Sequence, residues 1–455
     1  MNPLHVVILA AGQGSRMKSD LPKVLHSVAG RPMLHHVIGT ARQLGADKIH
    51  TVIGHGGDKV RATTTEDPVN WVVQDEQLGT GHAVAQALPY LPDDARVLIL
   101  YGDVPLTRTE TLQAMVESLD DDTLGLLTVT LDNPQGYGRI VRDANAQVTS
   151  IVEQKDAGKD QLAIREVNTG ILAIAARHLK SWLPTLSNAN AQGEYYLTDI
   201  IAMAVERSLK ISVSQPEDPF EVQGVNNRLQ LAELERWVQK REAERLMTDG
   251  ATLADPARID VRGELVIGKD ILIDVNVVFE GKVSLGNNVS VGPGCVIRDA
   301  VIADGVQINA HSVIDGAVIG ANAQIGPFAR IRPGTELAAN TKVGNFVETK
   351  KALVGEGSKI NHLSYVGDAS LGRNVNVGAG TITCNYDGVN KFQTVIGDGV
   401  FVGSNTSLVA PVCIGAGVTI GAGSTITRNV DDNELAVARG QQRNIKGWKR
   451  PQKSD

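Results

Sequence analysis

Apolar residues recur every six positions over long stretches of the C-terminal half of the chain. They are Ile267, Ile273, Phe279, Leu285, Val291 and Ile297, then Ile302, Ile308 and Ile314, then Ile319, Ile325, Ile331, Leu337 and Val343, and finally Ile396, Val402, Leu408, Ile414, Ile420 and Ile426. A period of six fits neither an isolated helix nor a hairpin, and it is typical of hexapeptide repeats that stack as a parallel β-helix. We expect about ten coils between residues 251 and 427.

The N-terminal half instead alternates strand and helix patterns. Apolar runs typical of buried strands occupy residues 5–10, 49–54, 71–74, 97–101 and 124–131. Residues 32–44 carry an amphipathic stripe that Gly45 ends as a C-terminal cap. Strands alternating with helices predict an α/β domain with a mainly parallel sheet, whose ligands bind beyond the carboxyl ends of the strands.

Three segments follow from these patterns. The α/β domain is expected to span residues 1–228. Residues 229–249 are rich in Leu, Glu, Arg and Lys and contain neither Gly nor Pro, so they are expected to form a linking helix. Residues 250–455 hold the β-helix and a polar, basic tail.

Composition narrows the class of protein. The 455 residues carry a net charge of −7 and no apolar run long enough to cross a membrane, so neither a nucleic-acid binder nor a membrane protein is expected. The first residues enter a strand without a basic leader, so no signal peptide is expected. The three cysteines lack metal or redox spacing, and Cys295 and Cys413 lie on or beside apolar positions where burial is expected. These features predict a cytoplasmic protein.

A glycine-rich run, LAAGQGSRM, follows the first predicted strand. Met17 stands where a dinucleotide-binding fingerprint needs its third glycine, which argues against a nicotinamide or flavin site. An ordinary strand-to-helix turn is one interpretation. However, Arg16 and Lys23, the latter in LPKVL, bring two cations close together, which favours a loop that holds a nucleotide by its phosphates.

Asp103 closes a later strand in the run YGDVPL. A solvated loop acid is one interpretation of this residue. A Mg²⁺ ligand is the better one, because Mg²⁺ in proteins often takes one or two carboxylates together with substrate phosphates.

These runs, with LGTGHA between them, resemble those of the nucleoside-diphosphate-sugar pyrophosphorylases over residues 5–228. The resemblance is closest to the uridylyltransferase half of the bacterial bifunctional enzymes that make UDP-N-acetylglucosamine, and it implies a Rossmann-like nucleotidyltransferase domain. It implies that Arg16 and Lys23 are catalytic cations and that Asp103 and Asn226 bind Mg²⁺. The residues it implies as contacts to UTP or UDP-N-acetylglucosamine are Leu9, Ala10, Ala11, Gly12, Lys23, Gln74, Gly79, Thr80, Tyr101, Gly102, Asp103, Gly138, Glu153, Asn168 and Asn226.

The six-residue pattern breaks at residues 383–395, where polar and aromatic residues enter. Arg332 and Lys350 are eighteen residues apart, which places them on one face of successive coils. A simple excursion loop and a surface histidine are the plainer interpretations of this region. A site at a seam between adjacent subunits is favoured, because His362, Tyr365 and Asn376 occur together with the two cations.

The runs VGNFVETKK, HLSYVGD and ITCNYDG resemble those of the hexapeptide-repeat acyltransferases over about residues 251–440, most closely the glucosamine-1-phosphate acetyltransferases. The resemblance implies a left-handed parallel β-helix, a homotrimer and His362 as general base. It implies that glucosamine-1-phosphate contacts Arg332, Lys350, Tyr365 and Asn376. The residues it implies as acetyl-CoA contacts are Ala379, Asn385, Tyr386, Ser404, Ala422 and Arg439.

The sequence therefore predicts a bifunctional enzyme. One half acetylates glucosamine-1-phosphate from acetyl-CoA, and the other transfers uridylyl from UTP to the product, supplying peptidoglycan and lipopolysaccharide synthesis. One alternative is a single-activity sugar-1-phosphate nucleotidyltransferase with a regulatory β-helix, against which Lys350, His362 and Tyr365 argue. Another is a nucleotide-sugar sensor, against which the cations Arg16 and Lys23 argue.

Overall fold

The computed structural model describes residues 2–65, 68–451 and 453 and divides into two compact units, residues 1–238 and 239–455. Residues 1, 66, 67, 452, 454 and 455, which fall in the predicted domains, lie outside the described residues. The division falls inside helix α8 (Arg228–Thr248), where the linking helix is expected. Among the described residues no helix is both long and apolar enough to cross a membrane.

The first unit is built on one twisted sheet with the strand order β11-β7-β10-β6-β1-β4-β5. These strands are β1 (Leu4–Ala10), β4 (Lys48–Ile53), β5 (Asn70–Val73), β6 (Arg96–Tyr101), β7 (Thr123–Thr130), β10 (Glu166–Ala175) and β11 (Lys210–Ser214). Strand β8 (Arg139–Arg142) pairs with β10 and with β9 (Val148–Val152). Strands β2 (Ser27–Val28) and β3 (Arg31–Pro32) form a separate small sheet. Only β10 runs antiparallel to its neighbours along the main path, so the sheet is mainly parallel, as predicted.

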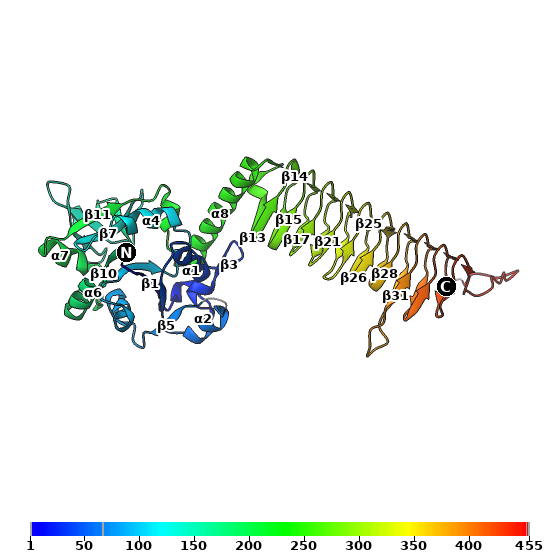
Figure 1. The fold of residues 1–455 in the computed structure, drawn as a ribbon, viewed down its shortest axis with the longest axis horizontal. Helices are drawn as coiled ribbons and strands as arrows, with labels where there is room; N and C mark the ends of the chain where they lie inside the picture. The colour runs from blue at the N-terminus through cyan, green and yellow to red at the C-terminus, as the bar shows by residue number, and fades with distance from the viewer. Residues whose placement is uncertain (1, 66–67, 452, 454–455) are drawn as a thin grey trace. The chain divides into compact units, whose positions relative to one another are not determined.

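Short helices cover this sheet (Figure 1). They are α1 (Met33–Gln43), α2 (Gly57–Thr63), α3 (Thr80–Ala85), α4 (Thr109–Glu117), α5 (Lys159–Leu162), α6 (Ala176–Trp182) and α7 (Asp199–Glu206). Alternate residues of β1 belong to two different apolar clusters. Val7 lies in one with Ile99 and Trp182, and Ile8 lies in the other with Leu34 and Leu100. The strand period of two thus places core on both faces of the sheet and leaves the strand ends for ligands.

The second unit is the predicted left-handed parallel β-helix, which Figure 1 shows as stacked coils. One face holds β12 (Ala251–Leu253), β14 (Ile271–Ile273), β16 (Ser290–Val291), β19 (Gln307–Ile308), β22 (Gln324–Ile325), β25 (Lys342–Asn345), β27 (Lys359–His362), β29 (Asn376–Val377), β32 (Phe401–Val402), β35 (Thr419–Ile420) and β37 (Leu435–Ala436). The other two faces hold β13 (Ile259–Ile267), β15 (Val277–Leu285), β17 (Val296–Arg298), β18 (Val301–Ile302), β20 (Val313–Asp315), β21 (Val318–Ile319), β23 (Arg330–Ile331), β24 (Glu336–Leu337), β26 (Glu348–Val354), β28 (Tyr365–Leu371), β30 (Ile382–Cys384), β31 (Thr394–Ile396), β33 (Ser407–Val409), β34 (Val412–Ile414) and β36 (Thr425–Ile426).

The apolar positions of the six-residue pattern line the inside of this β-helix. Ile273 pairs with Val291 and Val291 with Ile308, so that identical positions of successive coils stack in a continuous buried column. The coils run past the expected end, because Ile420 pairs with Ala436 of β37. The described residues supply eleven strands on the first face, against about ten coils expected.

One cysteine differs from its expectation. Cys295 is fully buried, as predicted, but Cys413 is exposed, because it lies between the inward-facing Val412 and Ile414 of β34. Alternation along a strand points every second side chain outward, so a position beside an apolar one is an outer position.

Candidate active sites of the two units

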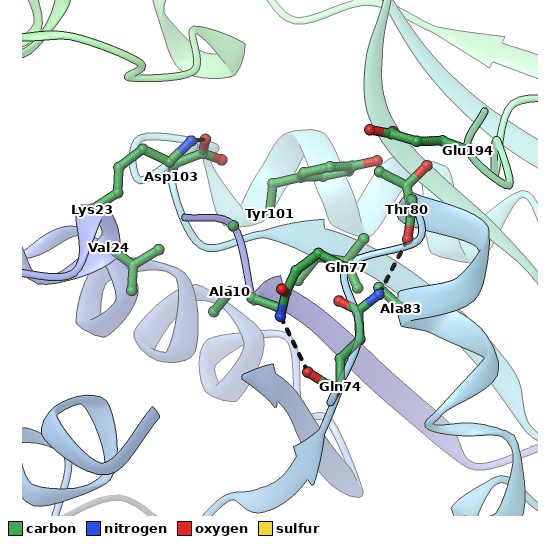
Figure 2. Close-up of a pocket in the computed structure, with 14 residues that line it drawn as sticks. Ala10, Lys23, Val24, Gln74, Gln77, Thr80, Ala83, Tyr101, Asp103 and Glu194 are labelled. Atoms are coloured by element: carbon green, nitrogen blue, oxygen red, sulfur yellow. Dashed lines mark hydrogen bonds and ion pairs between the residues drawn. The ribbon is translucent and has the colours of Figure 1, made fainter. Parts of the chain in front are cut away.

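The glycine-rich loop and the ends of three parallel strands enclose a cavity of about 290 Å³ in the first unit (Figure 2). β1 runs into the loop, Gln74 follows β5, and Tyr101 ends β6. Ten residues predicted to contact the nucleotide line it, namely Leu9, Ala10, Ala11, Gly12, Lys23, Gln74, Gly79, Thr80, Tyr101 and Asp103. The sequence prediction of a ligand site at the carboxyl ends of these strands therefore coincides with a cavity of ligand size.

Polar side chains converge at the open end of this cavity. Lys23, at the start of η2 (Lys23–Leu25), contacts Asp103 Oδ2 through its ammonium group, as Figure 2 shows. Asn226 Oδ1 lies 3.4 Å from Lys23 Nζ and accepts a hydrogen bond of 2.9 Å from Arg16 Nη2. Gly14, with φ of 63°, lets the loop pass Lys23, because a Cβ there would lie 2.7 Å from Lys23 Cβ.

The oxygens of Asp103 and Asn226 suit the Mg²⁺ ion that the family resemblance implies. The Lys23 ammonium contacts an oxygen of each residue, so the two oxygens share one cationic partner. Oxygen donors are the ligands that Mg²⁺ prefers, and substrate phosphates complete its shell. Asp103 and Asn226 are therefore the residues that would hold it.

Four further residues line the cavity that the sequence interpretation did not include: Val24, Gln77, Ala83 and Glu194. Gln77 lies between two predicted contacts and donates to Gln74 O at 3.3 Å. Glu194 comes from a distant loop that is held by hydrogen bonds of 2.8 Å from Tyr195 N to Leu78 O and from Gly81 N to Tyr195 O. Only its packing in the fold identifies Glu194, because no local sequence pattern marks it.

The predicted sugar contacts Gly138, Glu153 and Asn168 lie close to one another. Asn168 N donates to Gly138 O at 2.9 Å, and a Cβ on Gly138 would lie 3.2 Å from Glu153 Oε1. Burial raises the pKa of the Glu153 carboxyl, against the hydrogen bond from Thr198 Oγ1. The pKa of Tyr101 is also raised, mainly by burial and further by the nearby carboxylates of Glu153 and Asp103. Glu153 therefore lies near Tyr101, which lines the cavity.

In the second unit, a line of residues at one corner of the coils joins His362 to predicted acetyl-CoA contacts. Each carbonyl in the line accepts from the next coil: His362 O from Gly380 N at 3.3 Å, Ala379 O from Asn405 N at 2.8 Å, and Ser404 O from Gly423 N at 2.8 Å. Ala422 O accepts from Arg439 Nη1 at 2.6 Å. His362, Ala379, Ser404 and Ala422 therefore occupy equivalent positions of four successive coils.

A column of charged residues runs along a neighbouring face. Arg262, Glu280, Arg298 and Asp315 alternate in sign, with ion pairs between successive members. Arg332 and Lys350 occupy the same position in the next two coils, so that two cations stand next to each other in the column. The alternation thus ends at the two residues predicted to bind a sugar phosphate.

A third cation, Lys391 of the 383–395 segment, joins these two. Contact with the Lys391 ammonium is the largest cause that lowers the pKa of Lys350, and Arg332 lowers it further against Asp368. Arg332 Nη1 donates to Glu348 Oε1 at 2.7 Å, and Glu348 pairs in register with Tyr365. Asn385 Nδ2 contacts Asp368, which anchors this segment beside Lys350. The sequence interpretation did not include Lys391, although it lies in the segment that breaks the repeat.

The predicted acetyltransferase residues lie on two faces of the β-helix. Arg332, Lys350 and Tyr365 belong to one face, whereas His362 ends β27 and Asn376 begins β29 on another. Tyr386 is exposed on the 383–395 segment. The two groups are thus distributed around one corner of the coil.

Three family models match the chain. A MobA-like NTP transferase domain matches residues 6–192, a GMPPB C-terminal domain matches residues 261–340, and a bacterial transferase hexapeptide model of six repeats matches residues 393–428. A solved nucleotidyl transferase from Methanothermobacter thermautotroptrophicus has a TM-score of 0.39 and 20% identity, covering 52% of this chain and 97% of its own. The fold and the matched families define a nucleotidyltransferase joined to a hexapeptide-repeat transferase.

Relatives match over the whole length. The Bifunctional protein GlmU of Marinobacter nauticus is 77% identical over 454 residues, covering 100% of both chains. A protein of the same name from Pseudomonas putida is 60% identical over 451 residues, covering 99% of both. The chain belongs to the GlmU family of bifunctional proteins. The predictions of a uridylyltransferase and an acetyltransferase in one chain are therefore confirmed.

Proposed function

We propose that the β-helix acetylates glucosamine-1-phosphate with acetyl-CoA and that the first unit then transfers uridylyl from UTP to N-acetylglucosamine-1-phosphate. The products are UDP-N-acetylglucosamine and pyrophosphate. The observation that carries the proposal is that one chain holds two features. They are the cavity lined by Lys23 and Asp103 and the line of equivalent coil positions that runs from His362 to Ala422. UTP and acetyl-CoA are cytoplasmic metabolites, so we place both reactions in the cytoplasm.

Uridylyl transfer at the first site needs no general base. A sugar phosphate loses its second proton around pH 6, so the nucleophile is already charged at neutral pH. The obstacle is repulsion between this anion and the triphosphate. Arg16 and Lys23 offset it by facing the phosphates and stabilising charge as pyrophosphate departs. Mg²⁺ held by Asp103 and Asn226 would supply further charge stabilisation at the phosphates.

Acetyl transfer does need a base, because the amine of the sugar is an ammonium ion near neutral pH and cannot attack. His362 takes a proton from this ammonium, and the freed amine nitrogen forms a bond to the acetyl carbon while the carbon–sulfur bond breaks. The nitrogen gives up its second proton as the amide forms, and the coenzyme sulfur takes up a proton and leaves as the free thiol. Arg332, Lys350 and Lys391 form the cationic group that binds the sugar phosphate. The small side chains Ala379 and Ala422, in line with His362, leave room for the coenzyme.

We further propose that the enzyme works as a homotrimer through its β-helices. The residues assigned to glucosamine-1-phosphate and to acid–base chemistry lie on two faces of one chain, and a neighbouring subunit would complete each site at the seam. The exposed aromatic rings of Phe328 and Phe346, stacked at 5.5 Å on the same corner as His362, offer apolar surface for that contact.

One assay tests the pair of activities. Glucosamine-1-phosphate, acetyl-CoA, UTP and Mg²⁺ are supplied together, and each is omitted in turn. The full mixture should yield UDP-N-acetylglucosamine, omission of UTP should stop at N-acetylglucosamine-1-phosphate, and omission of acetyl-CoA should leave no acetylated sugar. Uridylyl transfer to supplied N-acetylglucosamine-1-phosphate without any acetyl transfer would instead favour a single-activity enzyme with a regulatory β-helix.

A further inference from the structure

We propose that Asn345 is a positioning residue that fixes the imidazole of His362 in the tautomer with its proton on Nδ1. The inference rests on the proposed role of His362 as the general base. His362 Nδ1 and Asn345 Oδ1 lie 2.8 Å apart. With the amide oxygen facing Nδ1 as the acceptor, the imidazole donates through Nδ1, and its neutral form then keeps the lone pair on Nε2.

The fold holds the two side chains in register. Asn345 and His362 are paired positions of β25 and β27 on successive coils. Asn345 O also accepts from Leu363 N at 3.1 Å, so main chain and side chain link the same two positions. The corner residues that follow, Phe346 and Leu363, share a left-handed conformation with φ of 56° and 49°. The contact therefore arises from the repeat geometry rather than from a flexible surface encounter.

The same line of residues sets the direction of Nε2. Asn345 lies one coil before His362, and Ala379, Ser404 and Ala422 lie in the coils after it. A hydrogen bond from Nδ1 toward Asn345 turns the opposite edge of the ring away from Asn345. Nε2 is then the nitrogen available to the ammonium group of a sugar beside the proposed coenzyme positions.

An amide suits this position better than a carboxylate for a base that must start unprotonated. A carboxylate would favour the imidazolium ion by charge, and at neutral pH more of the base would already carry a proton. The strands packed on β27 add no carboxylate here: β25 contributes Lys342 and Asn345, β29 contributes Asn376, and β27 itself carries Lys359. Asn345 thus orients the ring without adding negative charge.

The test compares Asn345→Ala and Asn345→Asp in the full-length protein, with kcat and KM for acetyl transfer measured across the pH range in which histidine titrates. Asn345→Ala should lower kcat roughly 10- to 100-fold, with little change in KM, because it removes the orientation of the base but not the base, which supplies about 10²–10⁴-fold. Asn345→Asp should recover most of the rate at alkaline pH and move the acid limb of the profile upward by about one pH unit.

Two controls separate this role from others. Uridylyl transfer by the same preparations reports an intact first unit, and the thermal transition of the β-helix, measured by calorimetry, reports an intact second unit. Lys342→Gln changes an exposed side chain of the same strand without touching His362. A wild-type rate and acid limb for Asn345→Ala would overturn the proposal, as would an Asp variant as slow as Ala with an unshifted limb. Failure of His362 as the base shows separately, as undiminished acetyl transfer by His362→Ala.

Discussion

The ammonium group of Lys23 contacts Asp103, and 14% and 16% of the two side chains' surfaces are exposed. Asn226 Oδ1 lies 3.4 Å from the same nitrogen. The two oxygens proposed as Mg²⁺ ligands thus already share one cation. Since like charges at one oxygen pair repel, a metal ion competes with Lys23 for this point unless nucleotide phosphates draw the ammonium away.

We therefore expect Lys23→Gln to strengthen the binding of Mn²⁺ to the nucleotide-free enzyme by about tenfold, or roughly 1.4 kcal/mol. The same change should slow uridylyl transfer by roughly 10²–10³-fold, because a charge that stabilises the transition state is lost. Electron paramagnetic resonance of free Mn²⁺ measures the first effect. The matched control is Lys59→Gln, which removes an ammonium that donates a hydrogen bond to the carbonyl of Asp20. Unchanged or weaker Mn²⁺ binding in the Lys23 variant contradicts the competition.

Lys391 should contribute to the binding of glucosamine-1-phosphate. Its ammonium lies against Lys350, and an anion bound between the two would relieve that repulsion. A charge-assisted hydrogen bond contributes about 1.5–3 kcal/mol, so Lys391→Ala should raise KM for the sugar phosphate by at least roughly tenfold. The control is Lys282→Ala, an exposed lysine elsewhere on the β-helix. An unchanged KM, measured by thiol release from acetyl-CoA, would remove Lys391 from the site.

The repeat made the β-helix predictable, because a period of six imposes one buried side chain on each short face, from Ile273 to Ile426. The nucleotide cleft was predictable where its residues lie in local runs, as for Gln74 and Asp103. Glu194 was not, because a distant loop brings it there through Tyr195. Asn345 lies in the run VGNFVETKK, but its contact with His362 depends on the register between coils, which the identity of the side chains alone does not reveal.

A buried histidine pair should make the first unit sensitive to acid. His5 Nδ1 and His50 Nε2 lie 3.0 Å apart between β1 and β4. The pKa of His50 is lowered from 6.5 to about 4, first by burial and then by the nearby His5 and Lys48. Burial also lowers the pKa of His5, although the carboxylates of Asp47 and Asp94 act in the opposite direction. The unfolded chain thus binds a proton that the folded chain excludes. The free energy of unfolding should be highest above pH 6.5 and fall as pH drops toward about 4.

Urea unfolding of the wild type and of His50→Gln across this range checks the sign. The variant should lose less stability on acidification, because one excluded proton no longer contributes. His55→Gln, at an exposed position nearby in sequence, should follow the wild type. Identical pH slopes for the wild type and the His50 variant would contradict the burial argument.

Gln239 should stabilise the first coil of the β-helix. Its amide donates to Val261 O at 2.8 Å and accepts from Val261 N at 2.7 Å, and 3% of the residue is exposed. The side chain thus satisfies backbone groups on the strand edge that β15 does not pair. Gln239→Met leaves both unpaired at a cost of about 1–3 kcal/mol each. We expect calorimetry to show a lower β-helix transition temperature for Gln239→Met than for the control Gln307→Met, which changes an exposed outer position. Equal temperatures for the two variants would contradict this.

The most direct test of two separate active sites in one chain measures both activities in His362→Ala and Asp103→Asn. His362→Ala should abolish acetyl transfer and leave uridylyl transfer to N-acetylglucosamine-1-phosphate at the wild-type rate. Asp103→Asn should do the reverse, with uridylyl transfer lowered by roughly 10²–10³-fold or more. Equal loss of both activities in either well-folded variant would contradict the assignment of one reaction to each unit.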